Sequence, residues 1–272
     1  MSSSPSLHKS WRPTALVSGS AALHLAAIAT AVVRPHSWPW ILGAVATDHV
    51  LLAAAGLWPR SKLLGPNWTR LPDRAAARGA VAITIDDGPD PDITPRVLAL
   101  LDDHSIKATF FCIGEKVERH ADLVREMVRR GHAIENHTQR HRHNFSLLGP
   151  GGLTDEIGRA QETIAAVTGT RPLFFRAPAG LRNPFLDPVL SRLGLQLASW
   201  TRRGFDTVSR DTEAVLGKLT RDLGGGDILL LHDGHASRTR SGQPLILEVL
   251  PQLLTAVARA KLQPITLRSA LT

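Results

Sequence analysis

The chain has 272 residues, a hydrophobic content of 43% and a formal net charge of +8, so it can form one sizeable core and still keep a segment for another use. Its arginines are scattered, with no basic helix and no interleaved aromatic residues, which argues against a nucleic-acid-binding protein. The single cysteine, Cys112, excludes an intrachain disulfide and a cysteine-rich zinc site, and its apolar surroundings (ATFFCIG) indicate core packing.

Two long apolar runs lie near the start of the chain. Residues 14–33 contain His24 as their only titratable side chain, and residues 41–58 follow after the short turn RPHSWPW. As a helix, each run is about as long as the hydrocarbon core of a bilayer is thick. Tryptophans, which favour membrane interfaces, lie at the edges of the runs: Trp38, Trp40 and Trp58. We therefore expect a helical hairpin that anchors the chain in a membrane.

Two alternatives to a membrane anchor stay open. The high alanine and glycine content, together with Asp48 and His49 inside the second run, would also suit a soluble hairpin packed on the main domain. A cleaved signal peptide fits less well, because the first run is long for such a peptide and a second apolar run follows. The apolar length favours the membrane, since the two polar side chains can face the partner helix.

Basic residues indicate how such a hairpin would be oriented. They flank its outer ends at Lys9, Arg12, Arg60, Lys62 and Arg70, whereas the turn holds a single arginine. Because basic flanks stay on the cytoplasmic side, we expect the main domain in the cytoplasm, at a bacterial inner membrane. If only the first run spans, that domain is periplasmic. The expected division is residues 1–75 for the hairpin and linker and residues 76–272 for the main domain.

Strand-like and helix-like segments alternate through the rest of the chain. The strand-like stretches are VAITI, ATFFCI, HAIEN, LFFRAP, LQLASW, DILLLH and QPITLR. Apolar residues at helical spacing, such as Val97, Leu100 and Leu101, lie between them. This alternation predicts a parallel sheet covered on both faces, and seven units suit a small, incomplete βα barrel. No GxGxxG or Walker sequence is present to indicate a nucleotide site.

Titratable residues follow the predicted strands, where the active site of a parallel barrel forms. They are Asp86, Asp87, His137, His141, Arg176, Asp206, His232 and Asp233. Taken alone, a DDG sequence is more often a solvated turn, and one HxxxH among 12 histidines is a weak signal. Gathered at one rim, however, these residues predict a single polar site.

The pair His137 and His141 has a spacing that lets two imidazoles meet at one ion. With an aspartate from another strand end, they form a two-histidine, one-carboxylate set with room for water, which suits catalytic zinc or a similar divalent ion. One aspartate of the neighbouring pair would bind the metal and the other would remain free as a base.

Five motifs, TIDDGPD, HTQRH, RAPAG, SWTRRGFD and LLLHDG, occur in the order seen in polysaccharide deacetylases of the NodB-homology family, carbohydrate esterase family 4. The sequence resembles this family over residues 80–267. The resemblance implies a deformed (β/α) barrel that removes N-acetyl groups from amino sugars with a divalent metal, zinc first and cobalt, nickel or manganese as alternatives.

The resemblance also implies roles for individual residues. The metal ligands would be Asp87, His137 and His141. Asp86 matches the general base, and Arg176 matches the cation that keeps this base ionised. Removal of the acetyl group would then combine a polarised carbonyl, an activated water and a positioned base.

For the second proton transfer, His232 matches the general acid that protonates the departing amine, and Asp206 the carboxylate that orients it. A loop aspartate such as Asp206 could instead cap the next helix, but Asp211 offers a better cap for that helix. We expect His143 and His235 to be ordinary histidines at the rim, outside the site.

The sequence departs from the family pattern in the substrate groove. Ala179 stands where an aromatic residue is frequent, and Arg203 and Thr207 replace a frequent aspartate and tryptophan. Because aromatic faces grip sugar rings, we expect a short or lipid-linked amino-sugar glycan rather than a bulk polymer. Two rival functions remain: a catalytically silent member that only binds carbohydrate, and a carbon–nitrogen hydrolase acting on a non-sugar amide.

Overall fold

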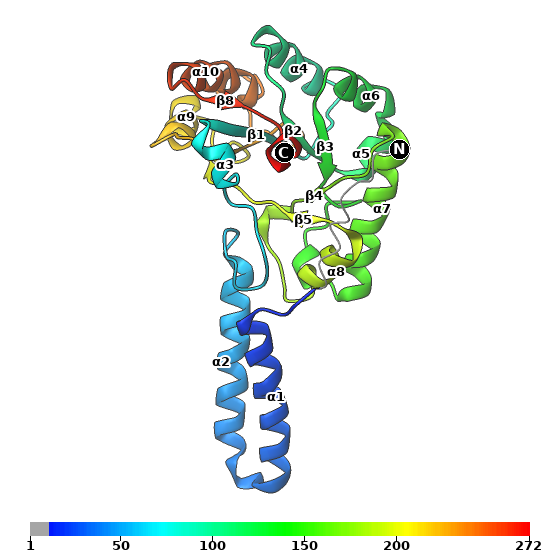
Figure 1. Cartoon of the computed structure of the whole chain (residues 1–272), viewed down its shortest axis with the longest axis vertical. Helices are drawn as coiled ribbons and strands as arrows, with labels where there is room; N and C mark the ends of the chain where they lie inside the picture. Colours follow the sequence, from blue (N-terminus) through cyan, green and yellow to red (C-terminus); the bar gives the residue numbers. More distant parts are fainter. Residues whose placement is uncertain (1–10) are drawn as a thin grey trace.

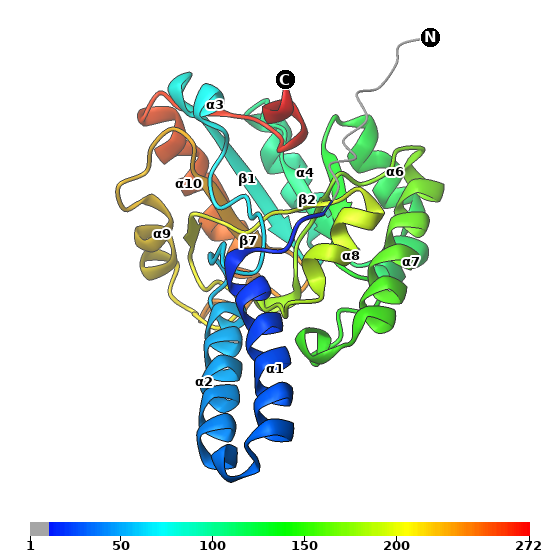
Figure 2. The same ribbon diagram turned by 60° about the horizontal axis from the view of Figure 1, so that its bottom comes forward.

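The computed structural model describes residues 11–272, so Lys9, one of the basic flanks counted above, lies outside the described residues. A helical hairpin projects from an α/β domain in both views (Figures 1 and 2). The hairpin comprises α1 (Ala15–Val33) and α2 (Trp38–Leu57), joined by the short helix η1 (Pro35–Ser37). The second helix thus begins three residues before the predicted apolar run, at the tryptophan-rich turn.

The α/β domain contains one parallel sheet. Its strands are β1 (Ala80–Asp86), β2 (Thr109–Cys112), β3 (Ala133–Asn136), β4 (Phe174–Phe175), β5 (Gln196–Leu197), β6 (Arg202–Arg203), β7 (Ile228–His232) and β8 (Gln263–Pro264). The order is β5-β4-β3-β2-β1-β7-β6, and β8 pairs with the start of β1. Among residues 11–272 no pairing joins β5 to β6, so the barrel is incomplete. The predicted deformed (β/α) barrel is confirmed.

One strand was not predicted from the sequence. β6 consists of two arginines, which carry no apolar signal, although Arg202 and Arg203 pair in register with Leu229 and Leu230 of β7. The predicted strands in LQLASW and QPITLR are correct in place but shrink to two paired residues each.

Helices surround the sheet and connect its strands. They are α3 (Asp73–Ala77), α4 (Thr94–Asp103), α5 (Gly114–Arg119), α6 (Ala121–Arg129), α7 (Pro150–Thr168), α8 (Leu186–Leu193), α9 (Thr212–Thr220) and α10 (Leu245–Arg259), with short 3₁₀ turns η2 (Phe145–Leu147), η3 (Pro178–Gly180) and η4 (Arg268–Leu271).

The central strand β1 is buried along its whole length, and its alternate residues face different layers. Ile83 and Ile85 pack in the cluster that the outer helices cover, whereas Ala82 packs in the barrel interior with Phe111 and Phe174. This alternation follows from the two-residue period of a strand. It leaves the carboxyl end of β1 as the place where polar side chains can enter the barrel.

The two helices of the hairpin are largely uncovered. None of the residues of α1 is buried, and α2 buries only Asp48, Ala55 and Gly56. Both helices are long and apolar enough to cross a membrane, by length and composition. Apart from Ala55 and Gly56, no apolar residue of these two described helices is buried.

The end of α2 is fastened to the loops at the carboxyl ends of β4 and β5. Arg182 N–H donates to Gly56 O over 3.1 Å, and Ser199 Oγ donates to Pro59 O over 2.7 Å. A Cβ on Gly180 would lie 2.6 Å from the Pro59 ring. The hairpin therefore joins the domain at the same end of the barrel as the predicted site.

Candidate active site

The paired aspartates at the end of β1 differ in backbone conformation. Asp86 is the last residue of the strand, on the same face as Thr84, and both side chains contact a guanidinium in the barrel interior. Asp87 has a φ of 72°, the left-handed region that non-glycine residues rarely occupy. If the strand continued, neighbouring carboxylates would point to opposite faces; the left-handed turn instead lets both lie at one opening.

Three side chains form a candidate metal site at this opening. Asp87 Oδ1 lies 3.1 Å from His137 Nε2 and 3.2 Å from His141 Nε2. Asp87 and His137 are buried, and His141 is partly exposed. The three potential ligand atoms all lie within 4.8 Å of one another, so a single ion could contact all three. This set is the one predicted from the sequence.

Two observations show that these residues fit a metal ion. Asp87 Oδ1 is buried but has no hydrogen-bond partner among residues 11–272, although unsatisfied buried polar atoms are rare. His137 Nδ1 lies 2.8 Å from Arg176 O. Because a carbonyl only accepts, Nδ1 carries the proton and Nε2 presents a lone pair toward Asp87. Such an outer hydrogen bond is typical of metal-binding histidines.

Electrostatics at the site favour the protonation states of His141 and Asp87 that can bind a metal. Burial and the neighbouring His137 lower the pKa of His141 to about 4, so its imidazole is neutral and able to bind a metal at ordinary pH. Burial would raise the pKa of Asp87, but the neighbouring His137 and His235 lower it well below the usual range. A deprotonated carboxylate and a neutral imidazole are the forms that ligate metals.

Asp86 is held by a buried arginine. Arg176 Nη1 donates to Asp86 Oδ1 over 2.7 Å and to Thr84 Oγ1 over 2.8 Å. The guanidinium is fully buried, and it also donates to Ser199 O over 2.7 Å. Burial lowers the pKa of Arg176 from its ordinary value, while the carboxylate of Asp86 opposes that effect. The guanidinium therefore holds the Asp86 side chain beside the candidate metal site.

His232 and Asp206 form a second pair. His232 Nδ1 lies 2.9 Å from Asp206 Oδ1, and His232 N–H donates to Asp206 Oδ2 over 2.7 Å. His232 is also opposite Asp86 in the pairing of β7 with β1. Burial lowers the pKa of His232, but the negative charge of Asp206 offsets this and raises the pKa overall. Asp211 caps α9, as its side chain accepts from Ala214 N–H, so Asp206 is not needed as a cap.

Two side chains at this rim were not predicted from the sequence. His235 was left out as an ordinary rim histidine, yet its Nδ1 lies 3.0 Å from Asp87 Oδ2. Phe205, beside Asp206, is 44% exposed and lies under the guanidinium of Arg203. His235 directly follows the LLLHDG motif, and this position was its one signal in the sequence. No sequence signal marked Phe205.

An incomplete parallel barrel whose rim combines a candidate metal site, a carboxylate held by arginine and an imidazole held by aspartate is suited to hydrolysis. A sequence profile described as polysaccharide deacetylase matches residues 73–198. A peptidoglycan-N-acetylglucosamine deacetylase of Bacillus cereus is 35% identical over 175 residues, which cover 64% of this chain and 81% of that protein.

Two further proteins extend the comparison. A chitooligosaccharide deacetylase of a Bradyrhizobium species is 34% identical over 157 residues, covering 57% of this chain and 71% of that protein. The structure of a family 4 carbohydrate esterase from Streptomyces lividans, in complex with acetate, has a TM-score of 0.62 and 31% identity, covering 68% of this chain and 91% of that chain. The chain therefore belongs to the polysaccharide deacetylase family, and it is a carbohydrate N-deacetylase, a hydrolase of carbon–nitrogen bonds.

Proposed function

We propose that this protein is a membrane-anchored, divalent-metal-dependent deacetylase that removes N-acetyl groups from a short or lipid-linked amino-sugar glycan. The observation that carries the proposal is the buried, unpartnered Asp87 Oδ1 between the Nε2 atoms of His137 and His141. Beside it lies Asp86, whose charge Arg176 keeps in place.

Asp87, His137 and His141 would hold the ion, and zinc suits a set of two imidazoles and one carboxylate. A bound divalent ion supplies a Lewis acid for the acetyl carbonyl and makes water easier to deprotonate. The chain's own groups do the rest. Asp86 accepts the proton of the attacking water, and Arg176 keeps this base ionised until it does.

The second proton transfer belongs to His232. Its Nδ1 is occupied by Asp206, so Nε2 is the nitrogen left to protonate the sugar amine as the carbon–nitrogen bond breaks. Without this proton, the leaving group would be an amide anion, which is a poor leaving group. Asp206 acts through His232: it fixes the orientation of the ring and favours the protonated form.

The hairpin supports the membrane anchor and the choice of substrate. Because α2 ends against the rim loops through Gly56, Pro59 and Arg182, the site opens near the end of the spanning helices. Exposed apolar side chains also occur on segments that follow strand ends: Leu147, Phe185 and Val208. Apolar side chains at a rim beside a bilayer can enter the interface, where a lipid-linked glycan is presented.

Acetate release tests the proposal. The full chain in detergent or vesicles is incubated with three N-acetylated substrates: a lipid-linked amino sugar, a short chitooligosaccharide and insoluble chitin. We expect acetate from the first two, loss of activity with chelator, and recovery with zinc or cobalt. Faster turnover of chitin would contradict the substrate class. Binding without metal-dependent acetate release would indicate a silent carbohydrate-binding protein, and turnover of non-sugar amides alone would indicate the other rival function.

A further inference from the structure

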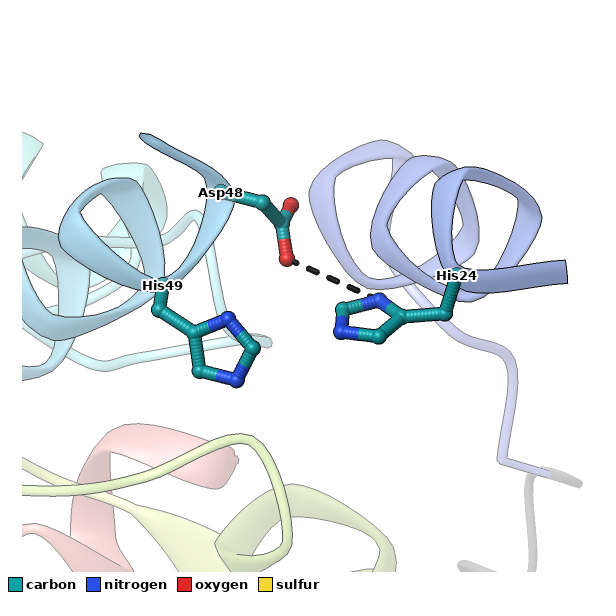
Figure 3. A group of neighbouring side chains, drawn as sticks. All are labelled: His24, Asp48 and His49. Atoms are coloured by element: carbon teal, nitrogen blue, oxygen red, sulfur yellow. Dashed lines mark ion pairs between the residues drawn. The ribbon is translucent and has the colours of Figure 1, made fainter. Parts of the chain in front are cut away.

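A second group of metal-binding side chains lies within the hairpin, outside the barrel. Figure 3 shows His24 of α1 facing Asp48 and His49 of α2 across the seam between the helices. One ligand atom from each of the three residues lies within 4.8 Å of the other two. All three occupy the middle of helices that contain no other ionisable side chain, and an ionisable side chain at such a place is costly and is usually retained for a function.

The helix backbone determines which ring nitrogen of each neutral imidazole carries the proton. His24 Nδ1 lies 2.8 Å from Ser20 O, and His49 Nδ1 lies 2.8 Å from Val45 O. Because both partners are carbonyl oxygens that only accept, each Nδ1 carries the proton in the neutral ring. The Nε2 atoms therefore present lone pairs, as ligating histidines do.

The carboxylate completes the set. Asp48 is buried in the seam, 6% exposed, and Ser20 Oγ donates to its Oδ2 over 2.7 Å. His24 Nδ1 is 3.9 Å from the same oxygen, too far for a hydrogen bond. One hydroxyl donor is poor compensation for a buried carboxylate, and its remaining lone pairs are available to a cation.

We propose that His24, Asp48 and His49 bind a divalent transition-metal ion, zinc in the first instance, that links α1 to α2 at mid-length. Imidazole and carboxylate are ligands that zinc accepts in a tetrahedron. At bonds of about 2.0 Å, neighbouring ligand atoms in a tetrahedron lie about 3.3 Å apart, so ligand atoms that now lie within 4.8 Å of one another would move closer when an ion binds. The rings of His24 and His49 are not buried and can rotate to do so.

This inference is independent of the deacetylase mechanism, because the two sites share no residue. The test counts bound zinc in the full chain, purified in detergent with a tag that contains no histidine. After removal of metal and reloading with zinc alone, the unaltered chain is expected to retain two equivalents. Asp87→Ala should retain one equivalent, and His24→Ala/His49→Ala should also retain one. The triple variant, which combines Asp87→Ala with His24→Ala/His49→Ala, should retain none.

Matched controls separate metal binding from a failure to fold. His36→Ala removes an exposed histidine of the turn and should leave zinc content unchanged. His24→Ala/His49→Ala should keep its helical circular dichroism and, in the proposed deacetylase assay, its activity. Cobalt in place of zinc should give visible absorption bands in Asp87→Ala that disappear in the triple variant.

The outcomes distinguish the two sites. If Asp87→Ala holds no zinc, or holds an equivalent that His24→Ala/His49→Ala does not remove, the hairpin site is overturned and the three residues form only a polar contact between helices. If Asp87→Ala leaves the zinc content of the unaltered chain unchanged while His24→Ala/His49→Ala removes it, the hairpin site stands and the proposed catalytic metal fails.

Discussion

Asp86 and Asp87 are neighbours in sequence but have different surroundings, and the roles proposed for them can be separated by substitution. Asp87→Ala removes a ligand, so metal content and turnover should fall together. Asp86→Asn leaves the ligands in place, so the metal should stay while kcat falls by about 10²–10⁴, the usual contribution of a general base. Zinc content and kcat are measured on both variants; an empty site in Asp86→Asn would reverse the two assignments.

His235 provides a second prediction at the residue scale. Its contact with Asp87 Oδ2 orients the carboxylate so that Oδ1 faces the two histidines. His235→Ala should weaken zinc binding by about 10-fold or more, as loss of an outer hydrogen bond to a metal ligand does. Zinc affinity is measured by competition with a chelating dye. His143→Ala, which removes another exposed rim histidine, is the matched control; equal affinities in the two variants would mean that the His235 contact is incidental.

The pair of Asp206 and His232 makes a prediction about pH. Since Asp206 raises the pKa of His232, Asp206→Asn should lower that pKa and leave less of the protonated acid at neutral and alkaline pH. The alkaline limb of kcat/KM should therefore move to lower pH. Asp211→Asn, which affects only the cap of α9, should leave the limb in place. A pH profile that is unchanged in Asp206→Asn would exclude His232 as the acid.

At the scale of elements, the hairpin and the barrel meet through a close backbone contact. A Cβ on Gly56 would lie 2.1 Å from Arg182 O, whereas a Cβ on Gly43 of the same helix would meet nothing within 4 Å. Gly56→Ala should thus destabilise the chain by about 1–3 kcal/mol, as overpacking does. Gly43→Ala should not destabilise the chain, because alanine is favoured over glycine inside a helix by about 0.5–1 kcal/mol.

Thermal unfolding in detergent measures this difference. For a chain of this size, 1 kcal/mol corresponds to a shift in Tm of about 2–4 °C. Gly56→Ala should unfold several degrees below Gly43→Ala. Equal Tm values would mean that the end of α2 moves independently of the loop at Arg182, and the proposed proximity of site and membrane would lose its support.

At the scale of the whole molecule, the distribution of basic residues predicts which side of the membrane carries the barrel. Arg60, Lys62 and Arg70 follow α2, and the turn between the helices holds only Arg34. A reporter fused after Thr272 should therefore be active in the cytoplasm. A periplasmic signal would contradict this orientation and would make peptidoglycan or an exported polysaccharide the substrate to test.

How much of the fold and of the candidate site could be predicted from the sequence depends on whether neighbouring residues in the chain carry the signal. The apolar period and the residues after the strand ends predicted the parallel barrel, the helical hairpin and the placement of Asp87, His137 and His141 at one rim, whereas the pairs Asp86–Arg176 and Asp206–His232 were implied by the resemblance to the family. Such signals are local: a strand end followed by polar residues puts those residues at the same edge of any parallel sheet.

Contacts between segments with no local signal were decided only by the tertiary structure. β6 forms because β7 offers a free edge to two arginines, and His235 reaches Asp87 because its loop folds back over the rim. The hairpin ends at the rim because Gly56 admits the backbone of Arg182. In the same way His24 meets Asp48 only once two helices lie side by side. The sequence by itself determined the helices, the strands and the polar side chains that follow the strand ends. Tertiary packing between distant segments determined which of those ends lie together.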